Sequence, residues 1–477
     1  MSRGKAASAL DLPRPADLAA GKQQAAYEAL RQAILGRQLP ADSRLPSTRS
    51  LAERWGMSRG TLEAAFDRLH SEGYVQRTAG SGTRVCAVIP EQFIAAPTPQ
   101  ESSRRSPQPD QPQTRVQSSV PFVARRPDAE LFDFKAWARC VSRGLLAAGS
   151  GLRDAVHPAG LPALREQIAD YLRSYRGMRC EADEVIVTTG IRPGLDLIAR
   201  TLITPGDTVC VEDPGYLPAR QLFGLAGGRV HSVAVTDEGL DTDRLPATAR
   251  LAYVTPAHQA PLGMTLSVSR RLALLDWAAR CNAWVVEDDY DSEFNYNTAP
   301  LAALKALDGA DRVIYCGSFN KNLFAGLRVG FMVVPKVLRQ SLLQRLQVTG
   351  RLVGVTDQLG LVEYLQSGAF VRHLRATRQA YQARRDTLLA CLAEHAPGRY
   401  RISGQQGGLH FVLWLPPGVE EVDFRTRAAQ AGLSLQTLGD FCHSTVLPPA
   451  VIIGYTALTL AQIRFHGRAL AQLLADG

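Results

Sequence analysis

One lysine in the sequence stands in a setting that suits covalent chemistry. The stretch YCGSFNKNLFAGLRVGF (315–331) starts as a short apolar segment, and its single lysine, Lys321, lies among small and polar residues. A lysine that forms a Schiff base has to be accessible, at a strand end, and beside groups that hold an anion. Ser318 and Asn320 can donate hydrogen bonds to a phosphate, and Arg328 supplies a bidentate charge partner. Most lysines are surface charges, so Lys321 alone leaves both interpretations open.

A group of carboxylates precedes that lysine in the chain. The stretch WVVEDDYDSEF (284–294) begins as a buried apolar strand and ends in an acidic cluster that includes Asp288. A carboxylate at a strand end is where the partner of a pyridinium nitrogen belongs, because it keeps the ring protonated and electron-withdrawing. An acidic metal site is the alternative, but no histidine accompanies the cluster. We therefore expect no metal.

Two more strand ends could complete such a site. In EVIVTTGIRPGLDLIART (184–201) a strand, a glycine turn and a helix start follow one another, and this geometry would aim backbone N–H groups at an anion. In EDPGYLPA (212–219) a strand ends before Tyr216, whose ring could stack on an aromatic ring. Each feature is also common as a plain turn or as ordinary packing. Their value lies in occurring together.

These residues need a scaffold that brings strand ends together. From Pro121 onward, strand and helix patterns alternate, which predicts an α/β domain over residues 121–477 with a mostly parallel sheet covered by helices. Residues 88–120 precede it, and 91–120 hold five prolines and hardly an apolar cluster. Such a segment cannot bury enough surface to offset its ordering entropy, so we expect a flexible linker.

Residues 22–87 predict a separate small domain. Their patterns indicate three helices and a hairpin, over residues 23–35, 47–54, from Ser58 to Gly73, 74–78 and 82–86. Helix, tight turn, helix and β-wing is the arrangement that presents a recognition helix to the major groove of DNA. A three-helix unit with a hairpin is also a common packing module, so periodicity alone does not decide between the two.

Basic residues favour the DNA-binding interpretation. Arg59 and Thr61 lie in the first turn of the third helix, where arginine can contact guanine and threonine a base edge, a thymine methyl or a phosphate. Other arginines suit phosphate contacts, namely Arg44, Arg49, Arg77 and Arg84. Residues 1–90 hold 13 Lys+Arg and 8 Asp+Glu, which is +5 of the chain's net charge of +9. An uneven basic excess indicates a polyanionic partner.

Bulk composition excludes several classes of protein. Hydrophobic residues make up 45% and charged residues 21% of the 477-residue chain, as in ordinary globular proteins. The sequence contains no run of 18 apolar residues, so it predicts no membrane span. The N-terminal stretch lacks the apolar region of a secretory signal. The eight cysteines form no CxxC pair or Cys/His cluster. We expect reduced thiols, no zinc and a cytoplasmic location.

The string RLPSTRSLAERWGMSRGTLEAAFDRLHSEGYVQRTAGSGTRV (44–85) resembles the winged-helix signature of the GntR family over its whole length. The resemblance implies a double-stranded DNA operator as partner. The DNA-binding residues that it implies are Arg49, Arg59 and Thr61, with a wing tip from Gly80 to Gly82. Gly60 stands where the family often has a larger residue, which would remove one base or phosphate contact.

From about Phe122 to near the C-terminus, the chain resembles the fold-type I aminotransferases. More closely, it resembles the aminotransferase-like domain of MocR-type regulators, a GntR subfamily. Besides the strings above, the likeness includes VHPAGLPALREQIADYLRSYRGM (156–178) and VTPAHQAPLG (254–263). It implies pyridoxal 5′-phosphate as the cofactor. It also implies a homodimer, because fold-type I sites lie at a dimer interface.

The same resemblance assigns roles to individual residues. Lys321 would form the Schiff base with the cofactor, Asp288 would pair with the pyridinium nitrogen, and Tyr290 would meet the ring hydroxyl. Tyr216 would stack on the ring. The residues implied to hold the phosphate are Gly190, Ile191, Ser318, Asn320 and Arg328.

The chain departs from the pattern of active aminotransferases. Asn320 replaces a serine before the lysine, and residues 260–263 read Ala-Pro-Leu-Gly where classical members have Asn-Pro-x-Gly. Residues 154–157 offer no tyrosine for the phosphate of a neighbouring subunit. Residues 451–457 contain no arginine to hold a substrate carboxylate. Pro218 stands where some relatives carry a second carboxylate-binding arginine. We expect cofactor binding, but not transamination of an ordinary α-amino acid.

The two domains explain each other if the second senses a small molecule and the first reports it to DNA. We expect a regulator that responds to pyridoxal phosphate itself or to an amine or amino-acid effector, with little or no transaminase activity. One alternative is an active aminotransferase with an accessory DNA-binding domain, which a carboxylate-binding arginine would favour. Another is a repressor whose large domain is only a dimerisation scaffold. Retention of Lys321, Asp288, Tyr290 and Arg328 argues against the scaffold.

Overall fold

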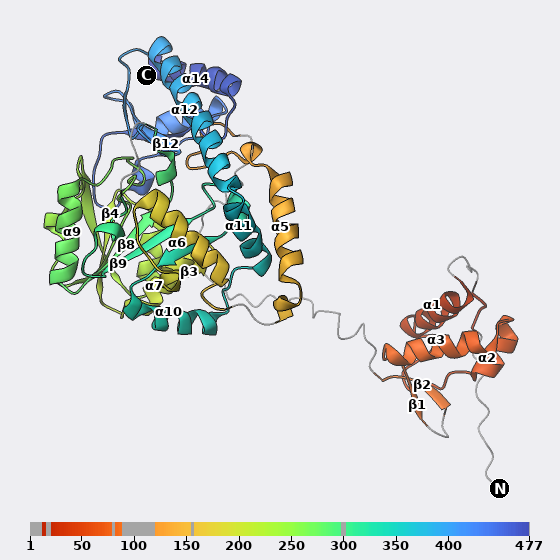
Figure 1. Cartoon of the computed structure of the whole chain (residues 1–477). Coiled ribbons are helices and arrows are strands. Elements are labelled where there is room, and N and C mark those ends of the chain that lie inside the picture. The colour runs from red at the N-terminus through yellow and green to blue at the C-terminus, as the bar shows by residue number, and fades with distance from the viewer. Residues whose placement is uncertain are drawn as a thin grey trace, which may run out of the picture. The chain divides into compact units, whose positions relative to one another are not determined.

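The computed structural model describes residues 12–15, 21–78, 82–87, 120–153, 157–296 and 302–476. The chain divides into two compact units, Met1–Gln113 and Thr114–Gly477, each with its own hydrophobic core (Figure 1). Of the predicted linker, residues 88–119 lie outside the described part of the chain.

The N-terminal unit contains the predicted three helices and hairpin. These are α1 (Lys22–Leu35), α2 (Thr48–Trp55), α3 (Arg59–Ser71), β1 (Val75–Thr78) and β2 (Gly82–Val85). The Ser47 and Ser58 hydroxyls cap α2 and α3, each accepting a backbone N–H at 3.1 Å, as small polar residues do at helix starts. Gly56, in the left-handed conformation with φ 65°, ends α2 and turns the chain towards α3. Trp55 and Phe66 lie in the core beneath.

The C-terminal unit is built on an eight-stranded sheet in the order β3-β10-β9-β8-β7-β4-β5-β6. Its strands are β3 (Val185–Thr188), β4 (Thr208–Asp213), β5 (Arg229–Thr236), β6 (Gly239–Leu240), β7 (Ala249–Val254), β8 (Trp284–Asp289), β9 (Val313–Ser318) and β10 (Gly330–Val333). The central run β5-β4-β7-β8-β9 is parallel, while β6 and β10 pair antiparallel with their neighbours. The sheet is thus mostly parallel, as predicted.

Helices cover the large sheet and continue into a C-terminal layer (Figure 1). They are α5 (Phe134–Ala148), α6 (Pro162–Arg176), α7 (Ile191–Leu202), α8 (Leu217–Leu225), α9 (Val268–Arg280), α10 (Lys336–Thr349), α11 (Val355–Gln366), α12 (Ala369–His395), α13 (Glu421–Gln430) and α14 (Leu460–Ala475). A small antiparallel sheet, ordered β11-β12-β14-β13, lies beside α12 and α14. Its strands are β11 (Arg401–Ser403), β12 (His410–Trp414), β13 (Gln436–Thr437) and β14 (Ala450–Gly454).

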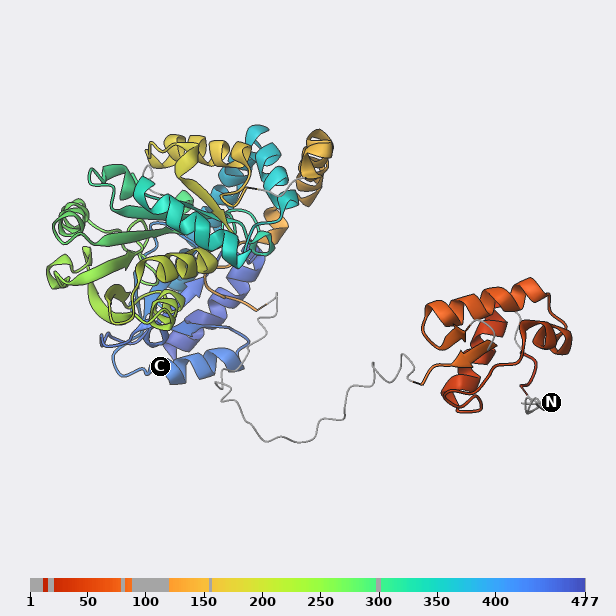
Figure 2. The same cartoon turned by 90° about the horizontal axis from the view of Figure 1, so that it is seen from below.

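Alternate strand residues of the large sheet enter different cores, because successive side chains point to opposite faces. On β9, Ile314 packs in a cluster with α7, α8 and α10, whereas Val313 packs with α9 and Tyr315 with α6, α11 and α12. Both faces are therefore covered by helices, as the turned view in Figure 2 also shows. Parallel strands that are buried on both faces have continuous apolar sequences, and these sequences are what predict β8 and β9.

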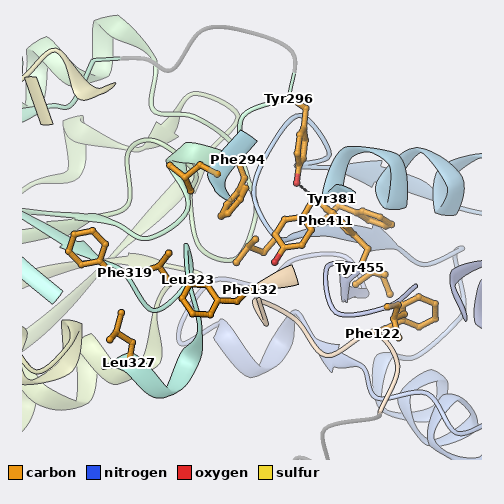
Figure 3. Packing of buried hydrophobic residues seen from close by; sticks show 14 of the residues in the cluster. Phe122, Phe132, Phe294, Tyr296, Phe319, Leu323, Leu327, Tyr381, Phe411 and Tyr455 are labelled. Carbon is orange, nitrogen blue, oxygen red and sulfur yellow. Dashed lines mark hydrogen bonds between the residues drawn. The ribbon is translucent and has the colours of Figure 1, made fainter. Parts of the chain in front are cut away.

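The segment that opens the C-terminal unit is fixed between the two sheets. Phe122 and Phe132 join the aromatic cluster around Phe411 and Tyr455 that Figure 3 shows. The Phe122 carbonyl accepts a hydrogen bond from the Gly454 backbone N–H at 3.1 Å. A Cβ on Gly454 would lie only 2.1 Å from the Val123 carbonyl oxygen, so the close approach requires glycine.

Hydrogen bonds and an ion pair continue this anchoring. The Asp128 backbone N–H donates to the Tyr381 hydroxyl at 2.8 Å, and the Asp128 carboxylate pairs with Arg384 at 2.8 Å. The Pro121 carbonyl accepts from the Ser434 backbone N–H at 3.0 Å. Residues 121–128 are therefore held along their length, and the side chains between the anchors are placed precisely.

Within the described residues, no helix is long and apolar enough to cross a membrane. Nor does any group of three or more His, Cys, Asp or Glu side chains in that part of the chain have the geometry to hold a metal ion. All eight cysteines are unpaired.

A buried ion pair links α6 to the end of β8. Arg176 Nε lies 2.7 Å from Asp289 Oδ2, and both side chains are 2% exposed. The Tyr315 hydroxyl donates to the same carboxylate oxygen at 2.6 Å. Each charge has lost its water, so the two depend on each other.

Arg176→Met should destabilise the C-terminal unit by about 3–5 kcal/mol, because it leaves the Asp289 carboxylate buried without its cation. The matched control is Arg173→Met on the same helix. Arg173 pairs with Asp170 at 2.8 Å, but both side chains are more than half exposed, so its loss should cost under about 1 kcal/mol. Urea unfolding of both variants measures the difference, and equal losses would contradict the role of burial.

Candidate functional site

A cavity of about 640 Å³ opens where the carboxyl ends of β4, β7, β8 and β9 meet. Five of the nine residues predicted for the cofactor line it, namely Ile191, Tyr216, Asp288, Tyr290 and Lys321. The other lining residues are Val123, Ala124, Arg125, Arg192, Tyr253, Thr255, Ala260, Arg425, Ser434, Leu435, Gln436 and Asp440. The cavity thus lies between the edge of the large sheet and the C-terminal layer.

Lys321 follows β9 and reaches into this cavity. Its Nζ donates a hydrogen bond to the Arg125 carbonyl oxygen at 2.5 Å. Burial, helped by the nearby Arg125 cation, lowers the pKa of Lys321 to about 8. A larger share of the amine is therefore uncharged near neutral pH than for an exposed lysine, which is what a nucleophilic amine requires.

Asp288 lies near the end of β8 and is buried. Its Oδ2 accepts a hydrogen bond from the Tyr253 hydroxyl at 2.5 Å. Burial raises the pKa of Asp288 to about 7, even though the bond from Tyr253 favours the charged form. A cation placed against this carboxylate would return it to the charged state. Tyr253, on β7, was not singled out in the sequence, where it reads as an ordinary aromatic strand residue.

Tyr290 belongs to a polar group on the next loop. Its hydroxyl lies 3.1 Å from His258 Nδ1, and the same nitrogen lies 3.1 Å from Asp291 Oδ2. Burial disfavours a charged His258, but the Asp291 carboxylate outweighs it and raises the pKa of the imidazole. Burial also raises the pKa of Tyr290 well above its ordinary value. His258 was missed because a single histidine in VTPAHQAPLG gives no pattern.

The predicted phosphate-binding residues gather at the start of α7. Gly190 caps this helix with φ 99°, and a Cβ there would lie 3.5 Å from Asn320 Nδ2 and 3.9 Å from the Arg328 carbonyl oxygen. Ser318 Oγ accepts the Asn320 backbone N–H at 3.2 Å. Asn320 Oδ1 is buried without a hydrogen-bond partner among the described residues. The Arg328 side chain is exposed, so its expected phosphate contact is not preformed.

Tyr216 is half-buried at the start of α8. Its hydroxyl accepts a hydrogen bond from Arg192 Nε at 3.1 Å. Just before it, the Asp213 carboxylate accepts the backbone N–H groups of His443, Ser444 and Thr445 at 2.7–2.9 Å. These bonds outweigh burial and lower the pKa of Asp213. They join the strand end that carries Tyr216 to the C-terminal layer.

The departures from active aminotransferases have structural counterparts. Ala260 lines the cavity, so an apolar methyl group stands where the asparagine was expected. The stretch 451–457 is almost entirely buried and contributes no side chain to the cavity lining. Residues 154–156 lie outside the described part of the chain.

In the N-terminal unit, α3 presents the predicted base-reading residues in its first turn. The Arg59 side chain is 68% exposed, and its Nε lies 2.8 Å from Glu63 Oε1. Thr61 Oγ1 lies 2.7 Å from Ser58 Oγ, so this hydroxyl takes part in the helix cap. Both side chains thus have a partner in the unbound chain, and Arg59 is the more exposed of the two.

The hairpin brings further arginines close to one another. Arg44 and Arg84 form an isolated antiparallel bridge, and Arg84 Nη1 donates to the Asp42 carbonyl at 2.7 Å. Gly82 has φ 86°, and a Cβ there would lie 2.8 Å from Arg44 Nε. The Arg44 guanidinium therefore lies against the backbone of Gly82, at the start of β2. Gly80, predicted for the wing tip, lies outside the described residues.

Several of the predicted DNA-contacting arginines hold a carboxylate in the unbound chain. The pairs are Arg49–Glu53 at 3.5 Å, Arg59–Glu63 at 2.8 Å and Arg77–Asp67 at 2.6 Å. Exposed pairs of this kind contribute about 0–1 kcal/mol, so phosphates or bases can replace the carboxylates at small cost.

Comparison with known proteins matches both units. Residues 22–85 match the bacterial regulatory proteins of the gntR family, and residues 126–433 match aminotransferase class I and II. The probable rhizopine catabolism regulatory protein MocR of Rhizobium meliloti is 36% identical over 461 residues, covering 94% of this chain and 92% of that protein. The chain belongs to the MocR-type regulators of the GntR family.

Other MocR-type relatives cover nearly the whole chain as well. The pyridoxine biosynthesis regulator PdxR of Corynebacterium glutamicum is 32% identical, covering 90% of each chain. TauR of Rhodobacter capsulatus is 32% identical, covering 88% of this chain and 90% of its own. Both are named as transcriptional regulators, which confirms the predicted family and its combination of domains.

Solved structures confirm the fold-type I aminotransferase fold of the C-terminal unit. The kynurenine aminotransferase of Pyrococcus horikoshii superposes with a TM-score of 0.69 at 26% identity, covering 76% of this chain and 92% of that one. LysN, an α-aminoadipate aminotransferase of Thermus thermophilus, gives a TM-score of 0.67 at 29% identity, covering 76% and 93%.

Asp288→Asn should stabilise the cofactor-free protein, by an amount that depends on pH. A carboxyl whose pKa rises on folding from 3.8 to about 7 binds more protons folded than unfolded between those values. The wild type therefore loses stability through this group as pH rises from about 4 to about 7, and the variant does not. The gain in thermal midpoint should be small at pH 4.5, grow to pH 7 and then level off. A gain independent of pH would contradict the assignment.

Proposed function

We propose that this chain is a pyridoxal 5′-phosphate-dependent transcription regulator whose C-terminal unit binds an amine or amino-acid effector. The observation that carries the proposal is Lys321 Nζ in a cavity that also exposes Asp288 and Tyr216, in a chain with a winged helix. Membership of a regulator family supports the DNA-binding half. The aminotransferase fold supports the cofactor half.

The described residues fit this cofactor. Lys321 provides an amine of lowered pKa, and Asp288 provides a buried carboxylate of raised pKa. Gly190 leaves the start of α7 open, and Nδ2 of Asn320, a hydrogen-bond donor, lies beside it. When bound, pyridoxal phosphate supplies an electrophilic carbon at which one primary amine can replace another.

Each residue then has a definite task. The α7 N-terminus with Ser318 and Asn320 would hold the phosphate, because a helix start attracts anions. The exposed Arg328 side chain would have to turn towards it. Asp288 holds the ring-nitrogen proton, and Tyr290 donates to the ring hydroxyl. Tyr216 covers one face of the ring.

Lys321 would be the group that an effector amine replaces on the cofactor, and this exchange would change the contacts that Lys321 makes in the cavity. Sensing requires that the ligand bind two conformations of the unit with different affinity. We propose that the protein acts as a homodimer on a double-stranded operator, in the cytoplasm, where its unpaired cysteines stay reduced.

An active aminotransferase with an accessory DNA-binding domain is the second candidate. The fold shared with solved aminotransferases favours it. Against it stand Ala260 in the cavity lining and the absence of an arginine from residues 451–457. The regulator is therefore the better-supported function.

Lys321→Ala should abolish covalent attachment of the cofactor. Among the described residues that line the cavity it is the single lysine. Borohydride reduction followed by intact-protein mass spectrometry measures the attachment. The matched control is Lys305→Ala, because Lys305 Nζ is also largely buried but contacts Asp311 and the Val313 carbonyl. The control should retain the adduct. A reducible adduct in the Lys321 variant would disprove the assignment.

The same variant tests the regulatory half of the proposal. Lys321→Ala should still bind operator DNA, because the two activities lie on separate units. Effector amines should change the operator affinity of the wild type but not that of the variant. An amine response that survives in the variant would show that sensing does not proceed through this lysine.

Arg59→Ala should weaken binding to the cognate operator by about 1–3 kcal/mol if Arg59 contacts a guanine. Binding to random DNA should fall much less. Arg77→Ala should instead weaken both alike and flatten the salt dependence, as loss of a phosphate contact does. Arg68→Ala, at the other end of α3, is the control with no expected effect. Fluorescence anisotropy at several salt concentrations measures all three, and equal losses on both DNAs for Arg59→Ala would exclude base reading.

A further inference from the structure

Arg125 lines the cavity beside Lys321, although nothing in the sequence singled it out. Its backbone carbonyl accepts the Lys321 ammonium at 2.5 Å. Its guanidinium carbon lies 4.8 Å above the Phe441 ring, and its Nη2 lies 3.4 Å from Gln436 Oε1. Nη1 is buried and has no hydrogen-bond partner among the described residues. Arg125 is thus a cavity-lining cation that carries a donor which no described group uses.

Two unfavourable features meet at this residue. Its backbone is left-handed, with φ 58°, a conformation that costs a residue with a Cβ about 1 kcal/mol or more. Its charge is withdrawn from water, and burial lowers the pKa of the guanidinium. The anchors on either side, in residues 121–128, hold it there. Strain and an unsatisfied buried donor at one position of a cavity indicate a ligand contact.

The other cations of the cavity are already engaged. Arg192 Nε donates to the Tyr216 hydroxyl at 3.1 Å. Arg425 Nη1 lies 3.3 Å from Asp440 Oδ2 and is 40% exposed. Arg125 alone among the cavity-lining arginines combines burial with an unpartnered nitrogen in the described residues.

The position of Arg125 separates it from the phosphate. The phosphate-binding residues gather around Gly190 and Asn320 at the start of α7. The Arg125 guanidinium instead contacts Gln436 and Phe441, which belong to the C-terminal layer. A ligand attached where Lys321 Nζ lies could thus extend towards Arg125 without meeting the phosphate.

We propose that Arg125 binds an acidic oxygen group, a carboxylate or a sulfonate, on the effector amine. Arginine suits this role because its fork of N–H groups matches two oxygens of such an anion. Residues 451–457, where a carboxylate-binding arginine is expected in an active aminotransferase, contain none, and Arg125 lies on a different segment of the chain. The assignment of the ligand as an effector amine rests on the proposed function.

The first experiment measures anion binding without the cofactor. Full-length cofactor-free protein is titrated at constant ionic strength with acetate, methanesulfonate and the neutral analogue acetamide, and thermal stability is followed. Acetate or methanesulfonate should stabilise the wild type, whereas acetamide should not. Arg125→Gln should need at least about tenfold more anion, since hydrogen bonds to charged groups are the strong ones. Comparing acetate with methanesulfonate separates carboxylate from sulfonate recognition.

Arg312→Gln is the matched control, because the Arg312 guanidinium also lies 4.8 Å from an aromatic ring, that of Trp284, but outside the cavity lining. It should respond like the wild type. Arg125→Gly is a second variant in case Arg125→Gln does not fold, since glycine adopts the left-handed backbone without strain. It should also lose the anion response while remaining folded. Equal responses to acetate and acetamide in the wild type, or an unchanged response in both Arg125 variants, would overturn the proposal.

The second experiment uses the cofactor-loaded protein and amines of equal length. β-Alanine and taurine should perturb the cofactor absorbance at concentrations at least about tenfold lower than β-alaninamide does, and Arg125→Gln should remove this preference. Both proteins are compared after loading to saturation, because loss of the Arg125 cation also raises the pKa of Lys321. Failure of the wild type to load would refute the proposed function and leave the anion titration standing. Normal loading without the preference would refute the Arg125 assignment alone.

Discussion

The parallel run β4-β7-β8-β9 forces the carboxyl ends of four strands to one edge of the large sheet. Each of these ends delivers a polar or aromatic group to the same cavity, because a strand that is buried on both faces has nowhere else to place one. Tyr216, Thr255, Asp288 and Lys321 follow from this single constraint. The covering helices and the C-terminal layer bury the side chains at that edge.

Burial of the titratable side chains accounts for their shifted pKa values in the cavity. Removal from water pushes the pKa of Asp288 up and that of Lys321 down, so acid and base approach each other near neutral pH. Neither group is near its own ordinary value, and small changes in neighbouring charge can transfer a proton to or from either. A protein that only needed a scaffold would gain from apolar residues at both positions.

Much of this could be predicted from the sequence, for a physical reason. Strand-end residues such as Asp288 and Lys321 follow recognisable apolar runs. The N-cap residues Ser47 and Ser58 predict the starts of α2 and α3. The winged helix is local in sequence, so its elements and arginines were placed together. The family resemblance supplied the roles that spacing alone left open.

What could not be predicted depends on contacts between distant parts of the chain. Arg125 precedes Lys321 by 196 residues and reaches it through an irregular segment without periodicity. His258 and Tyr253 become polar neighbours of the cavity only when β7 and β8 pair. The ion pair between Arg77 and Asp67 likewise needs β1 to pack beside α3.

Gly454 carries a consequence for engineering the ligand preference of this fold. It lies on β14, away from the cavity lining, yet it touches the Val123 carbonyl so closely that no larger residue fits. Val123 and Ala124 directly precede Arg125 in the chain. A methyl group at position 454 would therefore displace the backbone of these cavity-lining residues. Directed evolution confined to cavity-lining codons would overlook this position. Whole-gene libraries should keep this position as glycine, because the clash is with backbone atoms of Val123, which no side-chain change at Val123 removes.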